Sequence, residues 1–404
     1  MRRIFTSFVL LLSLALPSIA AACGAFVPQD DAVRQSQLRI IYAVDRPANQ
    51  MTVHIQINYV GEADQFAWIL PVPSNPKLEV SKVDFDELQN ATEPRLIFPT
   101  PPTNCLSATG GAAPGRGPDV LQQGSVGPYD FSVIQDKDPA VMVKWLRDNG
   151  YQVNDDVANA LKPYAEGGMA FLAMKLQNGR EASDIEPVAV TFQGTEPMIP
   201  LHLAAVSTEG TIPIYTWIFA DQKALPKDSI YFVMRPNDFA LTNTFGAHNY
   251  QTLRSGVLES VKGDGWVVEY ALPTSQLTVN NPVLQELKAK YPYVTRLYSR
   301  MSAENMRDLK ADPTFKFEAS VPDISNVFDL SKRDNPYYCD NNNDLSVRTV
   351  KEQQIAANET NQPTSEQVTA NLRRGPLRIV TVLFVVAILV LIWRLSRKRP
   401  RANV

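Results

Sequence analysis

The sequence is poor in the residues that most often carry chemistry. Its 404 residues include only three histidines and three cysteines, which are His54, His202, His248, Cys23, Cys105 and Cys339. It has no H-E-x-x-H, C-x-x-C, G-x-S-x-G or phosphate-loop motif, which excludes the motif-bearing zinc proteases, dithiol oxidoreductases, α/β-hydrolases and P-loop NTPases. A Ser–His–Asp triad needs no local motif, so an extracytoplasmic hydrolase with a dispersed active site stays an alternative. We predict no catalytic residue and no cofactor.

One acidic stretch comes close to a metal-binding pattern. In "DNNND", Asp340, Asn342 and Asp344 occupy the first three ligand positions of a calcium loop, and their oxygens suit Ca²⁺. Leu345 stands where the loop needs glycine, and Lys351 stands where the bidentate acid belongs. The three residues are weak metal candidates, and a polar linker explains the stretch better.

The charge is unevenly distributed along the chain. The net charge is −3, but residues 1–22 and 377–404 hold eight of the 39 basic residues and none of the 42 acidic ones. The chain between them is therefore clearly acidic. An acidic body repels phosphate backbones, which disfavours nucleic acid as a partner.

An apolar run at the N-terminus has the pattern of a secretory signal. Two arginines precede residues 4–16, which are almost all apolar, and Pro17 ends the run. Ala20 and Ala22 fit the small-residue cleavage rule. We predict a signal peptide over residues 1–22.

A second apolar run near the C-terminus is long enough to cross a membrane. As a helix, residues 377–395 span about 28 Å, close to the ~30 Å thickness of the hydrocarbon core. A basic tail, residues 396–404, follows, and the positive-inside rule puts such a tail in the cytoplasm. We predict one transmembrane helix over 377–395, with the bulk of the chain outside the cytoplasm.

Cys23 directly follows the predicted signal peptide. A bacterial lipid-attachment site prefers a large aliphatic residue three positions earlier, and Ala20 departs from that pattern. Lipid attachment at Cys23 is therefore less favoured, but a lipid-modified solute-binding subunit is kept as a further alternative. In an oxidising compartment three cysteines allow one disulfide and one thiol. The pair could be drawn from Cys23, Cys105 and Cys339, and the sequence does not select it.

The chain between the two ends is predicted to be α+β and rich in strands. Strict alternation over 52–60, with apolar segments on both sides, predicts an antiparallel meander of strands 38–45, 52–60 and 65–70. The predicted order is an N-terminal β-unit (23–98), a Gly/Pro-rich loop (99–128), an α+β remainder (129–339) and a polar stalk (340–376).

Helix-capping residues predict four helices. One covers 85–91, and the others begin after Asp138, Asn154 and Asn281, with Asn149-Gly150 ending the second and Pro163 limiting the third. Further strands are predicted over 169–176, 186–192, 199–207, 212–220, 229–235 and 265–272.

Four motifs together resemble a known family. They are "CGAF" after the signal, "FAWILPVP" at 66–73, "TRLYSRMS" at 295–302 and "DPTF" at 312–315. In combination they resemble the domain-of-unknown-function family 2330 of bacterial envelope proteins, over roughly residues 23–340. The family commonly has Cys-Gly-Gly-Phe, and here Ala25 replaces the second glycine. The resemblance implies a signal peptide and often a C-terminal membrane helix, but no activity, substrate or catalytic residue.

Individual motif residues have structural explanations. Trp68 is expected in the core with Phe66, because large aromatic residues mostly serve packing. His54 lies on the polar face of its strand and is expected to be exposed. Arg296 and Arg300 have helical spacing, and they are expected to pair with acids such as Glu304 rather than to bind an anionic ligand.

The sequence as a whole favours a membrane-anchored, non-enzymatic binding or structural module of the bacterial envelope. Its partners would be the membrane and an envelope protein. The hydrolase and the lipid-modified solute-binding subunit remain the alternatives.

Overall fold

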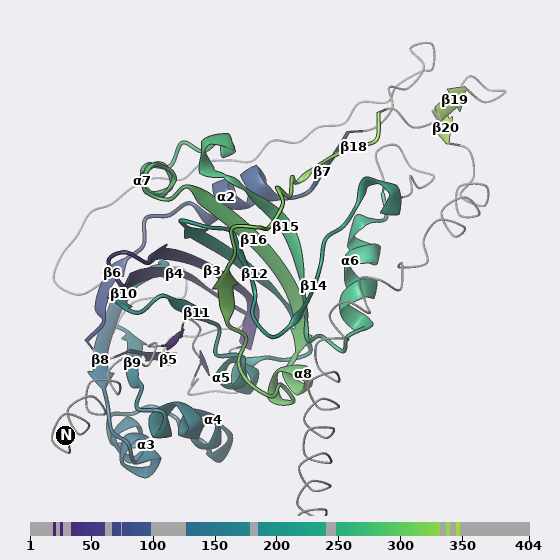
Figure 1. Cartoon of the computed structure of the whole chain (residues 1–404). Helices are drawn as coiled ribbons and strands as arrows, with labels where there is room; N and C mark the ends of the chain where they lie inside the picture. The colour runs from purple at the N-terminus through teal and green to yellow at the C-terminus, as the bar shows by residue number, and fades with distance from the viewer. Residues whose placement is uncertain are drawn as a thin grey trace, which may run out of the picture.

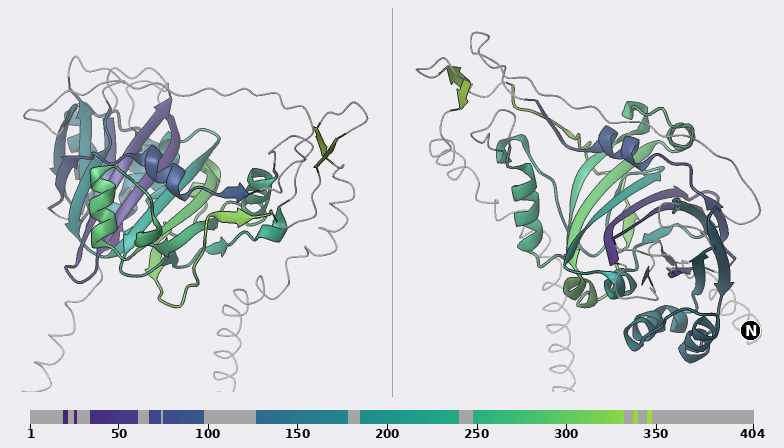
Figure 2. Two further views of the ribbon diagram at one scale, coloured as in Figure 1. Left: turned by 90° about the horizontal axis from the view of Figure 1, so that it is seen from above. Right: turned by 180° about the vertical axis from the view of Figure 1, so that it is seen from behind.

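A computed structural model describes residues 34–60, 67–73, 75–97, 127–177, 185–239 and 248–331, and the backbone of four short strands outside them. The described chain is mixed α+β and rich in strands, as the sequence predicts. Two sheets lie face to face and helices cover their outer faces, so the fold has four layers (Figures 1 and 2).

The larger sheet has eight strands in the order β14-β15-β16-β12-β3-β4-β10-β6. Neighbouring strands are antiparallel except for the parallel pairs β12–β3 and β14–β15. The strands are β3 (Arg34–Asp45), β4 (Gln50–Val60), β6 (Lys77–Val80), β10 (Val188–Gln193), β12 (Thr211–Ala220), β14 (Ile230–Phe232), β15 (Gly265–Pro273) and β16 (Tyr293–Ser302).

The smaller sheet is antiparallel and has the order β2-β5-β9-β8. Its strands are β2 (Ala25–Phe26), β5 (Ala67–Val72), β8 (Tyr129–Ile134) and β9 (Ala170–Leu176). Trp68 and Leu70 project into the main core between the sheets, whereas Ile69 faces the outer helices, as the two-residue period of a strand requires. Trp68 is 1% exposed, which confirms its prediction as a core residue.

Helices cover both outer faces. α3 (Pro139–Asp148) and α4 (Asp155–Glu166) pack on the smaller sheet, and α2 (Phe85–Thr92) and α7 (Pro282–Lys290) pack on the larger one. α6 (Tyr250–Glu259) covers the outer face near β15 and β16. Because helices pack outside it, the larger sheet buries side chains on both faces, including polar ones such as His54, Glu269 and Arg296.

Short elements complete the described chain. Four strand pairs lie outside the main sheets: β1 (Ile19–Ala21) with β11 (Glu196–Met198), β7 (Arg95–Ile97) with β18 (Val327–Asp329), β13 (Ala224–Pro226) with β17 (Phe315–Phe317), and β19 (Tyr337–Cys339) with β20 (Leu345–Val347). Two short helices, α5 (Leu201–Ala204) and α8 (Ala303–Arg307), contact each other. β1 falls inside the predicted signal peptide.

Local capping chemistry predicts the helices well. Side chains of Asp84, Asp138, Asn154 and Asn281 accept backbone N–H groups at the starts of α2, α3, α4 and α7. Gly150 has a φ of +76° just after α3, a conformation that favours glycine. Pro163 does not limit α4, which continues to Glu166. The proline leaves the Asn159 carbonyl without a donor, and Asn159 is an exposed residue on the solvent side of the helix.

The predicted three-stranded meander is wrong. β3 and β4 do form an antiparallel hairpin, but β5 leaves it and pairs with β9 in the smaller sheet. β12 and β10, which follow much later in the chain, flank the hairpin instead. A meander assumes that sequence neighbours pair, whereas here β5 packs across the core from the hairpin through its inward side chains.

The strand predicted over 199–207 is also wrong. The segment forms α5 and a 3-10 turn at Ala205–Ser207. Its apolar residues are nearly continuous, so they do not distinguish a buried strand from a buried helix. Asp312, far along the chain, accepts the His202 backbone N–H at 3.0 Å and helps to hold the first turn.

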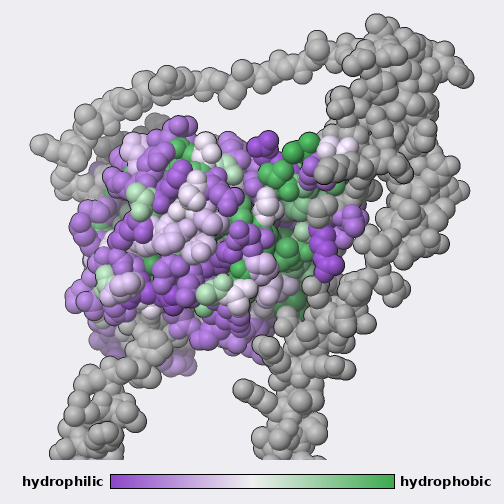
Figure 3. All heavy atoms as spheres, turned by 45° about the horizontal axis from the view of Figure 1, so that its top comes forward, coloured by the Kyte–Doolittle hydropathy of each residue, from purple (hydrophilic) through white to green (hydrophobic). Residues whose placement is uncertain are grey.

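Several predicted segments lie outside the described residues. These are most of the signal peptide, the larger part of the 99–128 loop, most of the stalk, the 377–395 span and the tail. Within the described part, no helix is both long and apolar enough to cross a membrane. Hydrophilic side chains dominate the face seen in Figure 3.

Candidate functional site

The predicted cysteine and metal candidates do not define a site. Cys23, Cys105 and the three weak metal candidates Asp340, Asn342 and Asp344 lie outside the described residues. Cys339 lies in β19, of which only the backbone is described. The disulfide therefore stays a prediction. Among the described residues, no group of three His, Cys, Asp or Glu is placed to hold a metal ion.

His54 is buried, so the prediction of an exposed side chain is wrong. Its ring is 6% exposed, and its Nδ1 lies 2.9 Å from the Ser81 hydroxyl. The segment that leads into α2 crosses this part of the sheet and covers the side that was expected to face water. Burial lowers the pKa of His54 to about 4, which keeps the imidazole neutral near pH 7.

His202 lies in a separate polar cluster near α5. Its Nδ1 is 2.8 Å from Asp312 Oδ1, and its Nε2 is 2.9 Å from the Leu309 carbonyl. Tyr164 donates its hydroxyl to the other Asp312 oxygen at 2.5 Å. The bond to Asp312 raises the pKa of His202, because two acceptors favour the doubly protonated ring. These groups are hydrogen-bonded to one another, so the cluster connects α4, α5 and the chain after α8.

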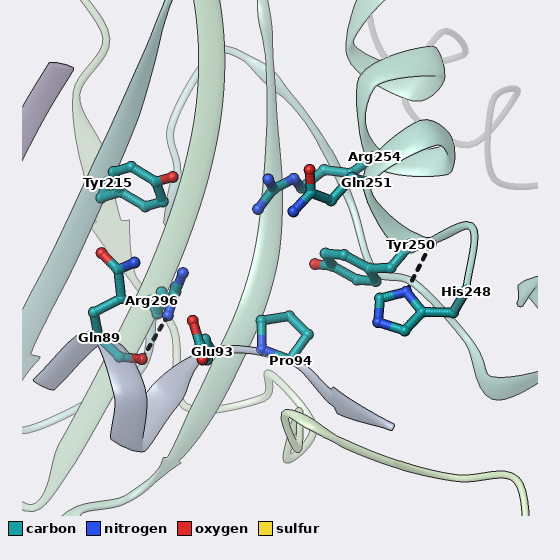
Figure 4. A pocket seen from close by; sticks show the side chains of 9 residues that line it. All are labelled: Gln89, Glu93, Pro94, Tyr215, His248, Tyr250, Gln251, Arg254 and Arg296. Atoms are coloured by element: carbon teal, nitrogen blue, oxygen red, sulfur yellow. Dashed lines mark hydrogen bonds between the residues drawn. The ribbon is translucent and has the colours of Figure 1, made fainter. Parts of the chain in front are cut away.

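A pocket of about 260 Å³ opens on the outer face of the larger sheet, between α2 and α6. Figure 4 shows its lining, with the α6 residues facing Arg296 and the end of α2. The lining consists of Gln89, Glu93, Pro94, Tyr215, His248, Tyr250, Gln251, Arg254 and Arg296. The charged side chains Glu93, Arg254 and Arg296 meet in this pocket, and it is our candidate site.

A buried carboxylate, Glu269 on β15, underlies the pocket. The ladder between β15 and β16 shifts register between Val268 and Tyr270, so Glu269 is the extra residue of a β-bulge. The bulge lets Glu269 and Tyr270 both project toward the outer face, although they are adjacent in sequence. The Glu269 side chain has no solvent exposure.

Two arginines share this single carboxylate. Arg254 Nη1 donates to Glu269 Oε1 at 2.9 Å, and Arg296 Nε lies 2.9 Å from Oε2. Tyr250, one helical turn before Arg254, donates its hydroxyl to Oε1 as well. The side chains of Arg296 and Arg254 are 2% and 12% exposed, so these charges interact with little solvent screening. The cluster has one positive charge in excess.

Aromatic rings and a helix end hold the two guanidinium groups. The Arg254 guanidinium carbon lies 3.5 Å from the Tyr298 ring centroid, and that of Arg296 lies 5.6 Å from Tyr215. Arg296 Nη1 also donates to the Gln89 carbonyl at 3.0 Å, where the C-terminal end of α2 favours a cation. Both arginines are thus pre-positioned.

Burial and neighbouring charges in the cluster shift the pKa values of Tyr250 and Arg254. Burial, followed by the charge of Glu269, raises the pKa of Tyr250, so its hydroxyl stays protonated and keeps donating. Burial alone would lower the pKa of Arg254, but the charge of Glu269, the neighbouring tyrosines and the hydrogen bond to Glu269 together more than offset it, and the pKa is raised. Arg254 therefore remains cationic at physiological pH.

Several polar groups of the pocket have no protein partner. Among the described residues, the Nη2 atoms of Arg254 and Arg296 make no hydrogen bond, and the carboxylate of Glu93 makes neither a hydrogen bond nor an ion pair. The amides of Gln89 and Gln251 and the Tyr215 hydroxyl likewise have none within the described chain. Polar groups left available in one concave surface are what a ligand site needs.

Arg296 was singled out from the sequence, but as part of a helix-like spacing that the structure does not contain. Its segment is strand β16, not a helix, so Arg296 and Arg300 do not stack as helical neighbours. Arg296 pairs with Glu269 rather than Glu304, and Arg300 is exposed. The sequence missed Arg254, Tyr250 and Glu269, although Tyr250 and Arg254 do have the i, i+4 spacing of one helix face.

The protein is therefore a four-layer α+β protein with a charged pocket on the outer face of its larger sheet. Residues 17–316 match the model of a family described as uncharacterized proteins conserved in bacteria, domain-of-unknown-function family 2330. The chain belongs to this family, as the resemblance of its motifs indicated. Comparison with curated proteins and comparison with solved structures both give no match.

Proposed function

We propose that this protein is a non-enzymatic binding module of the bacterial envelope that holds the carboxylate of a small ligand in the pocket between α2 and α6. One observation carries the proposal: the guanidinium groups of Arg254 and Arg296 share one buried carboxylate, both side chains line the pocket, and each has an Nη2 atom without a hydrogen bond in the described chain. Guanidinium groups bind carboxylates through paired, charge-assisted hydrogen bonds.

The lining chemistry supports binding rather than covalent catalysis. The described residues around the pocket include no serine, threonine or cysteine. The hydroxyl of Tyr250 is occupied by Glu269 and stays protonated. In the same proposal the body lies outside the cytoplasm, and the 377–395 segment tethers it to the membrane.

Isothermal titration calorimetry of the full-length protein with N-acetyl-L-alanyl-L-alanine tests the carboxylate site. The peptide amide of the same compound, whose carboxylate is blocked, is the matched ligand control. We expect the free carboxylate to bind and the amide to bind at least tenfold more weakly, because a charge-assisted hydrogen bond contributes about 1.5–3 kcal/mol. Arg254→Met should remove the difference, whereas Glu286→Gln, an exposed change on α7, should keep it. Equal binding of the two peptides to the wild type would contradict the proposal.

A further inference from the structure

Glu93 stands at an electrostatically unfavourable position. It is the first residue after α2, and its backbone N–H bonds to the Gln89 carbonyl as a helix C-cap. The last turn of α2 has no basic residue, and the C-terminal end of a helix carries a partial negative charge that repels a carboxylate. A carboxylate there is not explained by the stability of the helix.

No described group of the protein neutralises this carboxylate. Neither Arg254 nor Arg296 forms an ion pair with it, although all three side chains line the same pocket. Both arginines are instead directed to Glu269. The pocket therefore presents two separate electrostatic features, an arginine pair with one excess positive charge and a lone negative charge (Figure 4).

The size and the neutral groups of the pocket restrict what could satisfy both features. About 260 Å³ is at the small end of ligand pockets, so the ligand is compact. The side-chain amides of Gln89 and Gln251, which have no partner in the described chain, can donate to and accept from an amide bond. A plain anion would use the arginines and would be repelled by Glu93.

We infer that the ligand is a small zwitterion, an amino acid or a dipeptide, whose carboxylate meets Arg254 and Arg296 and whose ammonium group meets Glu93. This inference rests on the proposed carboxylate site and adds a second determinant, the free amine. Glu93 is then the residue that lets the pocket distinguish a ligand with a free amino group from one whose amino group is acylated.

Calorimetry with three forms of one dipeptide tests the inference on the full-length protein. The probes are L-alanyl-L-alanine, its N-acetyl form, which lacks the positive charge, and its C-terminal amide, which lacks the negative one. We expect the free dipeptide to bind about tenfold more tightly than the N-acetyl form, since one charge-assisted contact is lost. Free L-alanine against N-acetyl-L-alanine repeats the comparison for a single amino acid.

Two variants isolate the role of Glu93. Glu93→Gln should remove the preference for the free amine and tighten binding of the N-acetyl form, because the repulsion between the Glu93 carboxylate and the anion is lost. Glu93→Lys should reverse the preference. Because the Glu93 carboxylate makes no hydrogen bond or ion pair in the described chain, neither change removes a polar interaction of the fold, and the urea midpoint of each variant verifies this. Glu286→Gln on α7 is the charge-matched control.

The failures of the two proposals are distinguishable. If the wild type binds the free and N-acetyl forms equally and Glu93→Gln changes nothing, the zwitterion inference is overturned while the carboxylate site stands. If none of the probes binds, or if Arg254→Met leaves binding of the N-acetyl form intact, the carboxylate site itself is refuted and the zwitterion inference falls with it.

Discussion

Replacing Glu269 with glutamine should destabilise the protein strongly. The substitution keeps the volume of the side chain and removes its charge, so Arg254 and Arg296 lose their only shared counter-ion. With Glu269 unexposed and Arg296 2% exposed, solvent cannot replace the lost interaction. Breaking a buried ion pair by removing one partner costs about 3–5 kcal/mol.

Urea denaturation of the full-length protein measures this effect. With a denaturant dependence of about 3 kcal/mol per molar urea, the loss corresponds to a fall in the midpoint of about 1–2 M. The matched control is Glu259→Gln, an exposed position on α6, which should change stability by less than about 0.5 kcal/mol.

A double variant separates loss of charge balance from loss of packing. Adding Arg296→Met to Glu269→Gln removes one of the two stranded cations, so the double variant should be more stable than the sum of the single changes predicts. For residues in direct contact, such coupling is about 0.5–3 kcal/mol. A midpoint for Glu269→Gln that matches the wild type, or strictly additive effects, would show that the shared carboxylate does not balance the arginines.

Three further predictions concern the histidines and the tryptophans. The folded pKa of His54 is about 4, against about 6.5 in the unfolded chain, so its contribution to stability should be complete above pH 6.5 and fall by about 3 kcal/mol as the pH drops to 4. His54→Asn should flatten this part of a profile of urea midpoint against pH. An unchanged slope in the variant would contradict the assignment. The raised pKa of His202 acts in the opposite sense: its contribution to stability should be complete below about pH 6.5 and be lost as the pH rises through the folded pKa. This loss should be absent in His202→Gln. A wild-type stability that does not change above pH 6.5 would contradict the role given to His202. Trp217→Phe should cost about 1 kcal/mol more than Trp68→Phe, because Trp217 Nε1 donates to Thr92 at 2.9 Å whereas the buried Trp68 Nε1 has no partner among the described residues. Equal thermal or urea stability of the two variants would refute the comparison.

The sequence predicts the local elements of this fold better than its contacts. Helices with a side-chain cap and a proline or glycine signal were predicted closely, because those signals act within a few residues. α6 carries no such signal: Asn249 makes no side-chain cap, and Gly256 lies in the helix interior. Its apolar face becomes favourable only when it packs on β15 and β16, so it was missed.

The candidate site was only partly predictable, for a related reason. Arg296 and Glu269 are 27 positions apart, and their meeting depends on the register of two strands and on one bulged residue. A bulge leaves no periodic trace that a single sequence can show. His54 was misjudged because alternation reveals two faces of a strand but not what covers each of them, and here a loop covers the polar face.

The parallel pairing of β3 with β12 has a consequence for how the chain matures. The N-terminal hairpin leaves the ribosome early, yet the strands that flank it, β10 and β12, begin 128 or more residues after β4 ends. Until they are made, both edges of a strongly apolar ribbon stay open to pairing with other chains. Contacts so distant along the polypeptide also slow folding. Mispairing of residues 34–60 is therefore most favoured before residue 220 has been made.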